Sequence, residues 1–293
     1  MKRLALRLIA KLHLREGIYY TKKARRSSGA EADRLFQAAY EKYAAALKAN
    51  PRLHNALKGW GHALFYGTQN KSPKEQAKLY QQACEKYAAA HDIKPDDRET
   101  LYFWGLALSQ QAKGTPAKNS DELYRLAYEK FSETVALDRK DPKALHYWGL
   151  ALYDQARIKR GTEAQELYQA ACEKYSAALA LAPNKPNIMN DWGAALMGQA
   201  GLVTGDASAA LYRQAQEKFL AAEAIRPGIA CYSLACIHSL RGEYEECRKR
   251  LESARDHESL PPFSYIKNDA DLGKVRQLEW FKELIKTLRT SKA

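Results

Sequence analysis

The chain repeats itself every 44 residues, and this period restricts the folds open to it more than any other feature. The triplet Glu-Lys-aromatic recurs with that constant step at Glu41-Lys42-Tyr43, Glu85-Lys86-Tyr87, Glu129-Lys130-Phe131, Glu173-Lys174-Tyr175 and Glu217-Lys218-Phe219. A fixed period of about 20 to 50 residues is typical of arrays in which one supersecondary unit stacks on the next. We therefore expect a repeat array rather than a single compact globule.

The residues around each triplet predict a helix. A second aromatic stands seven residues before the first, at Phe36, Tyr80, Tyr124, Tyr168 and Tyr212, and an alanine stands between them, at Ala39, Ala83, Ala127, Ala171 and Ala215. Positions i, i+3 and i+7 share one face of a helix, and the alanine lets a neighbouring helix approach closely. A proline eight residues after the triplet aromatic, at Pro51, Pro95, Pro183 and Pro227, is expected to end this helix.

A Trp-Gly pair with the same period predicts a second helix in each repeat. It occurs at Trp60-Gly61, Trp104-Gly105, Trp148-Gly149 and Trp192-Gly193. Glycine inside a helix costs roughly 1 kcal/mol relative to alanine, so its recurrence indicates a tight contact between helices. Gly17 lies 44 residues before Gly61, so the N-terminal segment is in phase with the repeat. Capping patterns at Ser28, Ser72 and Thr162 are expected to begin the triplet-bearing helices.

These residues resemble the tetratricopeptide repeat (TPR). In the fourth repeat, the places of that family's pattern are taken by Trp148-Gly149, Tyr168, Ala171, Tyr175, Ala178 and Pro183. The repeat is about ten residues longer than the family's unit, which we expect to lengthen both helices. The resemblance implies an all-α, right-handed superhelical TPR-type solenoid of antiparallel helix pairs.

The pattern also predicts the limits of the array. Residues 1–9 form a basic lead-in, and residues 10–262 form five 44-residue helix pairs followed by one pair of standard length. We expect 263–271 to be irregular and 274–288 to be a final helix. That helix places Val275, Leu278, Phe281, Leu284 and Ile285 on one face, which would cap the array within the C-terminal segment 263–293.

The net charge of +13 is concentrated at the N-terminus, where residues 1–30 hold nine basic side chains against the single acid Glu16. The predicted basic patch comprises Lys11, Arg15, Lys22, Lys23, Arg25 and Arg26. Such a patch can meet nucleic acid, an anionic membrane surface or an acidic protein, and charge alone does not choose among them. The segment is also compatible with an organelle transit peptide, although its phase with the repeat argues against cleavage.

The sequence contains no catalytic, cofactor or metal motif that we can identify. Phosphate-binding loops, metalloprotease helices and nucleophile elbows are absent, so we expect no enzyme activity, no cofactor and no metal. The five cysteines form no CxxC pair, which predicts free thiols in a reducing, cytoplasmic environment. No apolar run is long enough for a membrane span. The Glu-Lys part of each triplet is expected to lie on a solvated helix face.

The TPR resemblance places a partner-binding groove along the first helix of each pair. Carried onto this chain, it gives Lys58, His62, Tyr66, Tyr102, Gln110, His146, Tyr147, Asp154, Asn190 and Asp191. Polar-tipped aromatic residues suit a peptide, a helix or a partner domain, so we expect a protein-interaction scaffold or adaptor. Only Lys58 and Lys143 match the carboxylate clamp of chaperone co-factors in this family. Three alternatives remain open: packing of these side chains against neighbouring repeats, nucleic-acid or anionic-surface binding through the basic repeat, and self-association.

Overall fold

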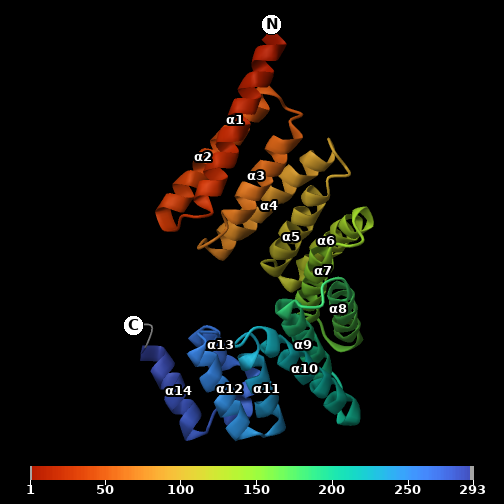
Figure 1. Cartoon of the computed structure of the whole chain (residues 1–293), viewed down its shortest axis with the longest axis vertical. Helices are drawn as coiled ribbons and strands as arrows, with labels where there is room; N and C mark the ends of the chain where they lie inside the picture. The colour runs from red at the N-terminus through yellow and green to blue at the C-terminus, as the bar shows by residue number, and fades with distance from the viewer. Residues whose placement is uncertain (1, 291–293) are drawn as a thin grey trace. The chain divides into compact units, whose positions relative to one another are not determined.

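A computed structural model describes residues 2–290, with side chains from Leu4 to Arg289, and in this range every regular element is a helix (Figure 1). The helices fall into two compact units, one ending at Gln155 and the other beginning at Ala156. The all-α arrangement of sequential helix pairs confirms the predicted TPR-type fold class.

The first unit contains three helix pairs and the helix that follows them. Its elements are α1 (Lys2–Ala24), α2 (Gly29–Ala49), α3 (His54–Tyr66), α4 (Pro73–His91), α5 (Arg98–Lys113), α6 (Ala117–Leu137) and α7 (Pro142–Ala156). Helices α1 and α2, α3 and α4, and α5 and α6 pack as pairs, as Figure 1 shows. The segment that bears the N-terminal basic residues is therefore the first helix of the first pair, as its phase predicts.

The second unit contains α8 (Gly161–Leu181), α9 (Pro186–Ala200), α10 (Gly205–Ile225), α11 (Cys231–Arg241), α12 (Tyr244–Asp256), α13 (Phe263–Asn268), the 3₁₀ helix η1 (Ala270–Val275) and α14 (Glu279–Thr290). The pair α11–α12 has the standard repeat length, with helices of 11 and 13 residues. In the long repeat α3–α4 the helices have 13 and 19 residues. The extra residues thus lengthen both helices, the second more than the first.

The two periodic motifs meet in the core of the pairs α3–α4, α5–α6 and α9–α10. The glycine of the first helix lies against the aromatic ring of the triplet on the second helix. A Cβ added at Gly61 would lie 2.5 Å from Tyr87, and one added at Gly105 would lie 2.9 Å from Phe131. Gly17 stands in the same relation to Tyr43, so the pair α1–α2 has the same contact between glycine and aromatic ring. The predicted close contact between helices therefore depends on the missing side chain.

In three repeats the lysine of the triplet covers the tryptophan that precedes the glycine, which corrects the expectation of a plain solvated face there. Lys86 Nζ lies 4.4 Å from the ring centroid of Trp60, and the pairs Lys130–Trp104 and Lys218–Trp192 lie at 4.7 Å and 3.9 Å. A cation over an indole face is stabilising by about 0.5–1 kcal/mol at an exposed site. In the first repeat Glu16 takes the tryptophan position, and Lys42 forms an ion pair with it at 3.0 Å.

The starts of the second helices agree only in part with the predicted caps. Ser72 forms a capping box with Glu75 at the start of α4, as predicted. Ser28 is the N-cap residue of α2, as predicted, but its side chain makes no capping hydrogen bond. Thr162 lies inside α8, whose N-cap is Arg160, so that prediction is wrong. In both helices a glycine in the left-handed region opens the helix instead, Gly29 with φ 58° and Gly161 with φ 59°.

The C-terminal segment is more helical than predicted up to residue 275, and its last helix begins later. Residues 263–268 form α13 rather than an irregular stretch, and η1 precedes α14, which starts at Glu279. Leu272 and Val275 are three residues apart in η1, so the tighter 3₁₀ turn points both into the core. They join Phe281 and Leu284 in a cluster with α11 and α12, so α14 covers the apolar face of the last pair as expected of a cap.

Candidate partner-binding face

A row of aromatic side chains runs across the first helices of the first unit. We call this row, formed by Tyr66, Phe103, Tyr102, Tyr147 and His146, the aromatic face. Successive ring centroids along it lie 6.0, 5.2, 5.8 and 5.1 Å apart. All five side chains are half-buried, so each one packs against its neighbours and still reaches the surface. Four of the predicted groove residues are thus brought together by α3, α5 and α7.

His62 supports this face from below rather than forming its surface. Its ring lies 4.3 Å from Phe103 and 5.7 Å from Tyr87, measured between centroids. Burial lowers the pKa of His62 to about 4, so the ring is neutral at physiological pH. Its Nε2 atom has no hydrogen-bond partner within the described part of the chain. His62 therefore packs against Phe103 and Tyr87, and its part in a binding surface stays a prediction.

Arg25 joins the predicted basic patch to the aromatic face. It follows the last turn of α1, and its guanidinium carbon lies 3.9 Å from the centroid of the Tyr66 ring. The pKa of Tyr66 is raised by burial, and the nearby Arg25 charge opposes that rise. The other members of the patch, Lys11, Arg15, Lys22, Lys23 and Arg26, are exposed.

Ion pairs between successive repeats border the aromatic face. Lys58 Nζ lies 2.8 Å from a carboxylate oxygen of Glu99 and 3.2 Å from one of Asp97. Burial works to lower the pKa of Lys58, but the hydrogen bond and charge of Glu99 outweigh it and the pKa is raised. Asp154 is buried, and Lys113 reaches it at 3.3 Å. Lys58 and Asp154 therefore carry partners from their own chain, which fixes their positions.

The remaining predicted residues are not members of this row. Gln110 is half-buried on α5. Asn190 and Asp191 lie on α9 in the second unit, where the Asn190 Oδ1 atom is buried without a hydrogen-bond partner among residues 2–290. Asp97 and Glu99 were not predicted. The available signal was their separation of about one repeat from Lys58, with opposite charge.

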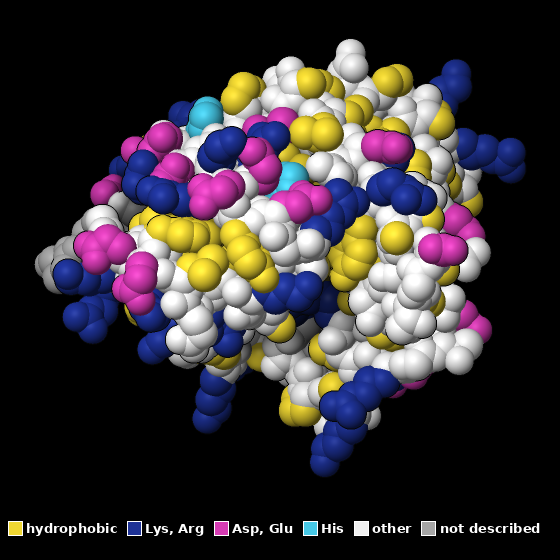
Figure 2. Space-filling model, turned by 90° about the horizontal axis from the view of Figure 1, so that it is seen from below, with side chains coloured by type: hydrophobic (Ala, Val, Ile, Leu, Met, Phe, Trp, Pro, Cys, Tyr) yellow, Lys and Arg dark blue, Asp and Glu magenta, His cyan; other side chains and the backbone are white. Residues whose placement is uncertain are grey.

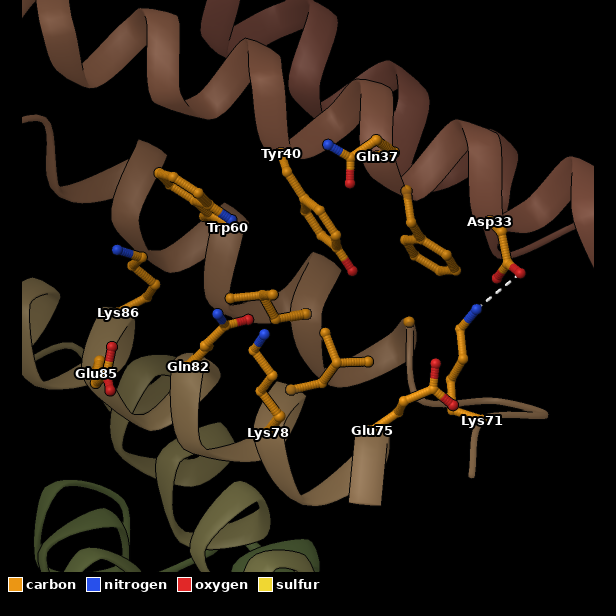
Figure 3. Close-up of a pocket in the computed structure, with 14 residues that line it drawn as sticks. Asp33, Gln37, Tyr40, Trp60, Lys71, Glu75, Lys78, Gln82, Glu85 and Lys86 are labelled. Carbon is orange, nitrogen blue, oxygen red and sulfur yellow. Dashed lines mark ion pairs between the residues drawn. The ribbon is translucent and has the colours of Figure 1, made fainter. Parts of the chain in front are cut away.

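A cleft lies against α3 in the first unit (Figure 3). Successive residues of a helix are turned by about 100° around its axis. Trp60 and Leu64 therefore lie across the axis of α3 from His62 and Tyr66, which belong to the side of the aromatic face. The cleft has a volume of about 610 Å³ and lies between α2 and α4, with Trp60 and Tyr40 among the residues that line it. An ion pair between Lys71 and Asp33 at 2.7 Å closes one end of it. Sequence reasoning did not predict this cleft.

One thiol and two carboxylates of the second unit lie close together. The ligand atoms of Cys236, Asp269 and Asp271 lie within 4.8 Å of one another. The Asp269 carboxylate already accepts hydrogen bonds from the Tyr232 hydroxyl at 2.6 Å and from the Asp271 backbone N–H at 3.0 Å. Asp269 caps the start of η1, which explains the position of its carboxylate. Burial raises the pKa of the Cys236 thiol, and this disfavours the thiolate that a metal ion requires.

The surface elsewhere is mixed in charge. In the view of Figure 2, acidic and basic side chains lie next to one another over much of the surface, with hydrophobic side chains exposed between them. The five cysteines are free, and burial raises the pKa of Cys84, Cys172 and Cys247 to about 12. Among the described helices, none has a stretch apolar enough and long enough to cross a bilayer.

Comparison with known proteins places the fold. No family model matches the sequence, and no curated protein matches it. A crystal structure of the MamA protein matches with a TM-score of 0.51 and 18% identity, over 77% of this chain and 96% of that chain. A second MamA structure matches with a TM-score of 0.43 and 21% identity, over 62% and 88% of the two chains. The human IFIT1 dimer with m7Gppp-AAAA matches with a TM-score of 0.47 and 14% identity, over 88% and 67%.

At these identities the likeness concerns the fold alone. The match to MamA covers most of both chains, and together with the helix pairs and the Gly–aromatic contacts it identifies the architecture as TPR-type. The helix pairing predicted from the 44-residue period is therefore confirmed.

Proposed function

We propose that this chain is a non-enzymatic adaptor that binds another protein along the aromatic face of the first unit. One observation carries the proposal: three successive first helices present a continuous row of half-exposed rings with hydroxyl and imidazole tips. Aromatic side chains dominate the energetic centres of protein interfaces because they bury a large area and lose little rotamer freedom. A peptide or helix laid across α3, α5 and α7 would contact several rings at once.

The chemistry of the face suits binding rather than catalysis. Burial raises the pKa of Tyr66 and Tyr102, which keeps both hydroxyls neutral and able to donate hydrogen bonds. The ion pairs of Lys58 and Asp154 supply a polar border around the rings, as at the rim of an interface. Gln110 on α5 would add a polar contact to the partner.

Partner capture with crosslinking mass spectrometry tests the proposal. The double variant Tyr102→Ala/Tyr147→Ala removes the centre of the row. The matched control Tyr244→Ala/Tyr265→Ala removes two partly exposed tyrosines from the second unit. We expect the parent and the control to capture the same proteins, with crosslinks on α3, α5 and α7, and the test variant to lose them while its circular dichroism is unchanged. Equal capture by both variants would place the binding surface elsewhere.

A further inference from the structure

The outward side of α1 exposes a row of leucines. Leu4, Leu8 and Leu12 are 65%, 60% and 57% exposed, and their spacing of four places them along one side of the helix. The packed side of α1 is different: Ala10, Gly17 and Thr21 are buried toward the rest of the unit. Isolated surface leucines need no explanation, but three in one continuous row do.

A second row, of cations, runs beside the leucines. Arg7, Lys11 and Arg15 each follow a leucine of the row by three residues, so each cation lies next to it on the helix surface. All three are exposed, and none forms an ion pair with an acid between Leu4 and Arg289. Glu16 is the only acid of the segment, and it is occupied by His13 and Lys42, each at 3.0 Å. The positive charge of this surface is therefore uncompensated.

We propose that α1 docks flat on an anionic phospholipid bilayer, with Leu4, Leu8 and Leu12 entering the boundary of the acyl chains. Arg7, Lys11 and Arg15 would then reach the phosphate and carboxylate groups of the lipids from the edge of the leucine row, because their long stems let the charge rise to the headgroups. Each cation next to an anionic membrane strengthens binding by about fivefold, and each leucine that leaves water does so by about tenfold.

The combination of rows favours a lipid surface over the other occupants. A nucleic acid rewards the cations but offers no apolar phase for aliphatic leucines, and the exposed leucines would stay in water. A second copy of the chain would bring the same uncompensated cations against each other. Charge complementarity and the apolar row are both satisfied only where anionic groups lie above a hydrocarbon layer. The aromatic face is not used, so this proposal is independent of the proposed function.

Vesicle co-sedimentation of the full chain tests the proposal. The probes are phosphatidylcholine vesicles with and without phosphatidylserine. We expect binding to the vesicles that contain phosphatidylserine and little binding to the others. The variant L4S/L8S/L12S should lose about a hundredfold or more in partitioning, and R7Q/K11Q/R15Q should lose about a hundredfold, with helicity preserved because all six side chains are exposed. The control L137S/L181S/L220S changes partly exposed leucines outside α1 and should bind like the parent.

Several results would overturn the proposal. One is the absence of binding to phosphatidylserine vesicles at low salt. Another is binding that the leucine variant leaves intact, since this would mean attraction by charge alone; a labelled RNA oligomer that binds the parent and the leucine variant equally would then identify nucleic acid as the ligand. A third is an oligomer of the parent, detected by light scattering, that becomes a monomer in L4S/L8S/L12S, together with no binding of the parent to vesicles. This result would assign the leucine row to contact with a second copy of the chain.

Discussion

The contact between Gly105 and Phe131 makes the substitution Gly105→Ala informative. A Cβ at this position on α5 would lie 2.9 Å from Cε1 and 3.0 Å from Cδ1 of the Phe131 ring on α6. Real Cβ contacts are rarely so short, so either the ring or the helix has to move. Phe131 is fully buried among Leu106, Tyr124 and Ala151, which leaves the ring little room.

Two effects of opposite sign set the magnitude. Overpacking a core costs about 1–3 kcal/mol. Replacing glycine by alanine inside a helix gains about 1 kcal/mol. We therefore expect Gly105→Ala to lower the free energy of unfolding by about 0–2 kcal/mol, and Gly61→Ala to lower it more, because its Cβ would lie only 2.5 Å from Tyr87.

Urea denaturation measures these changes against a control at the C-terminal end of the same helix. Gly114 follows α5, and a Cβ there would meet nothing closer than 3.7 Å, so Gly114→Ala should be close to neutral. Combining Gly105→Ala with Phe131→Leu should cost less than the sum of the two single changes, because the smaller side chain makes room. A gain of about 1 kcal/mol in Gly105→Ala would refute the reasoning, since it would reveal the helix propensity alone.

Two further predictions concern pH and capping. The pKa of His62 in the folded chain is about 4, below its ordinary value of 6.5, so unfolding takes up a proton and the free energy of unfolding falls by up to about 3 kcal/mol as the pH drops from 6.5 to 4. In a plot of melting temperature against pH, the variant His62→Phe should lose this part of the slope. An unchanged slope would contradict the assignment. Ser72→Ala should cost about 1 kcal/mol in urea denaturation because it removes the capping box, whereas Ser28→Ala should cost almost nothing, and equal effects would be inconsistent with the two caps.

The sequence alone determined the repeating architecture. Helix faces are local: the spacing of Tyr80, Ala83 and Tyr87 decides which side of α4 is apolar before any partner is known. The glycine beside each tryptophan indicated a close contact, and for Gly61, Gly105 and Gly193 the structure identifies the triplet aromatic as the partner. The phase of Gly17 predicted that the basic N-terminal segment belongs to the first repeat, and in the structure Gly17 lies against Tyr43 of α2.

The tertiary structure decided which distant residues meet. Tyr66, Tyr102 and Tyr147 are 36 and 45 residues apart in sequence, and only the lateral packing of α3, α5 and α7 brings their rings into one row. The same packing placed His62 beneath the row and Lys86 over Trp60. Periodicity specifies the direction of a side chain from its own helix, but the neighbour it meets depends on the offset and rotation between helices, which no local pattern fixes.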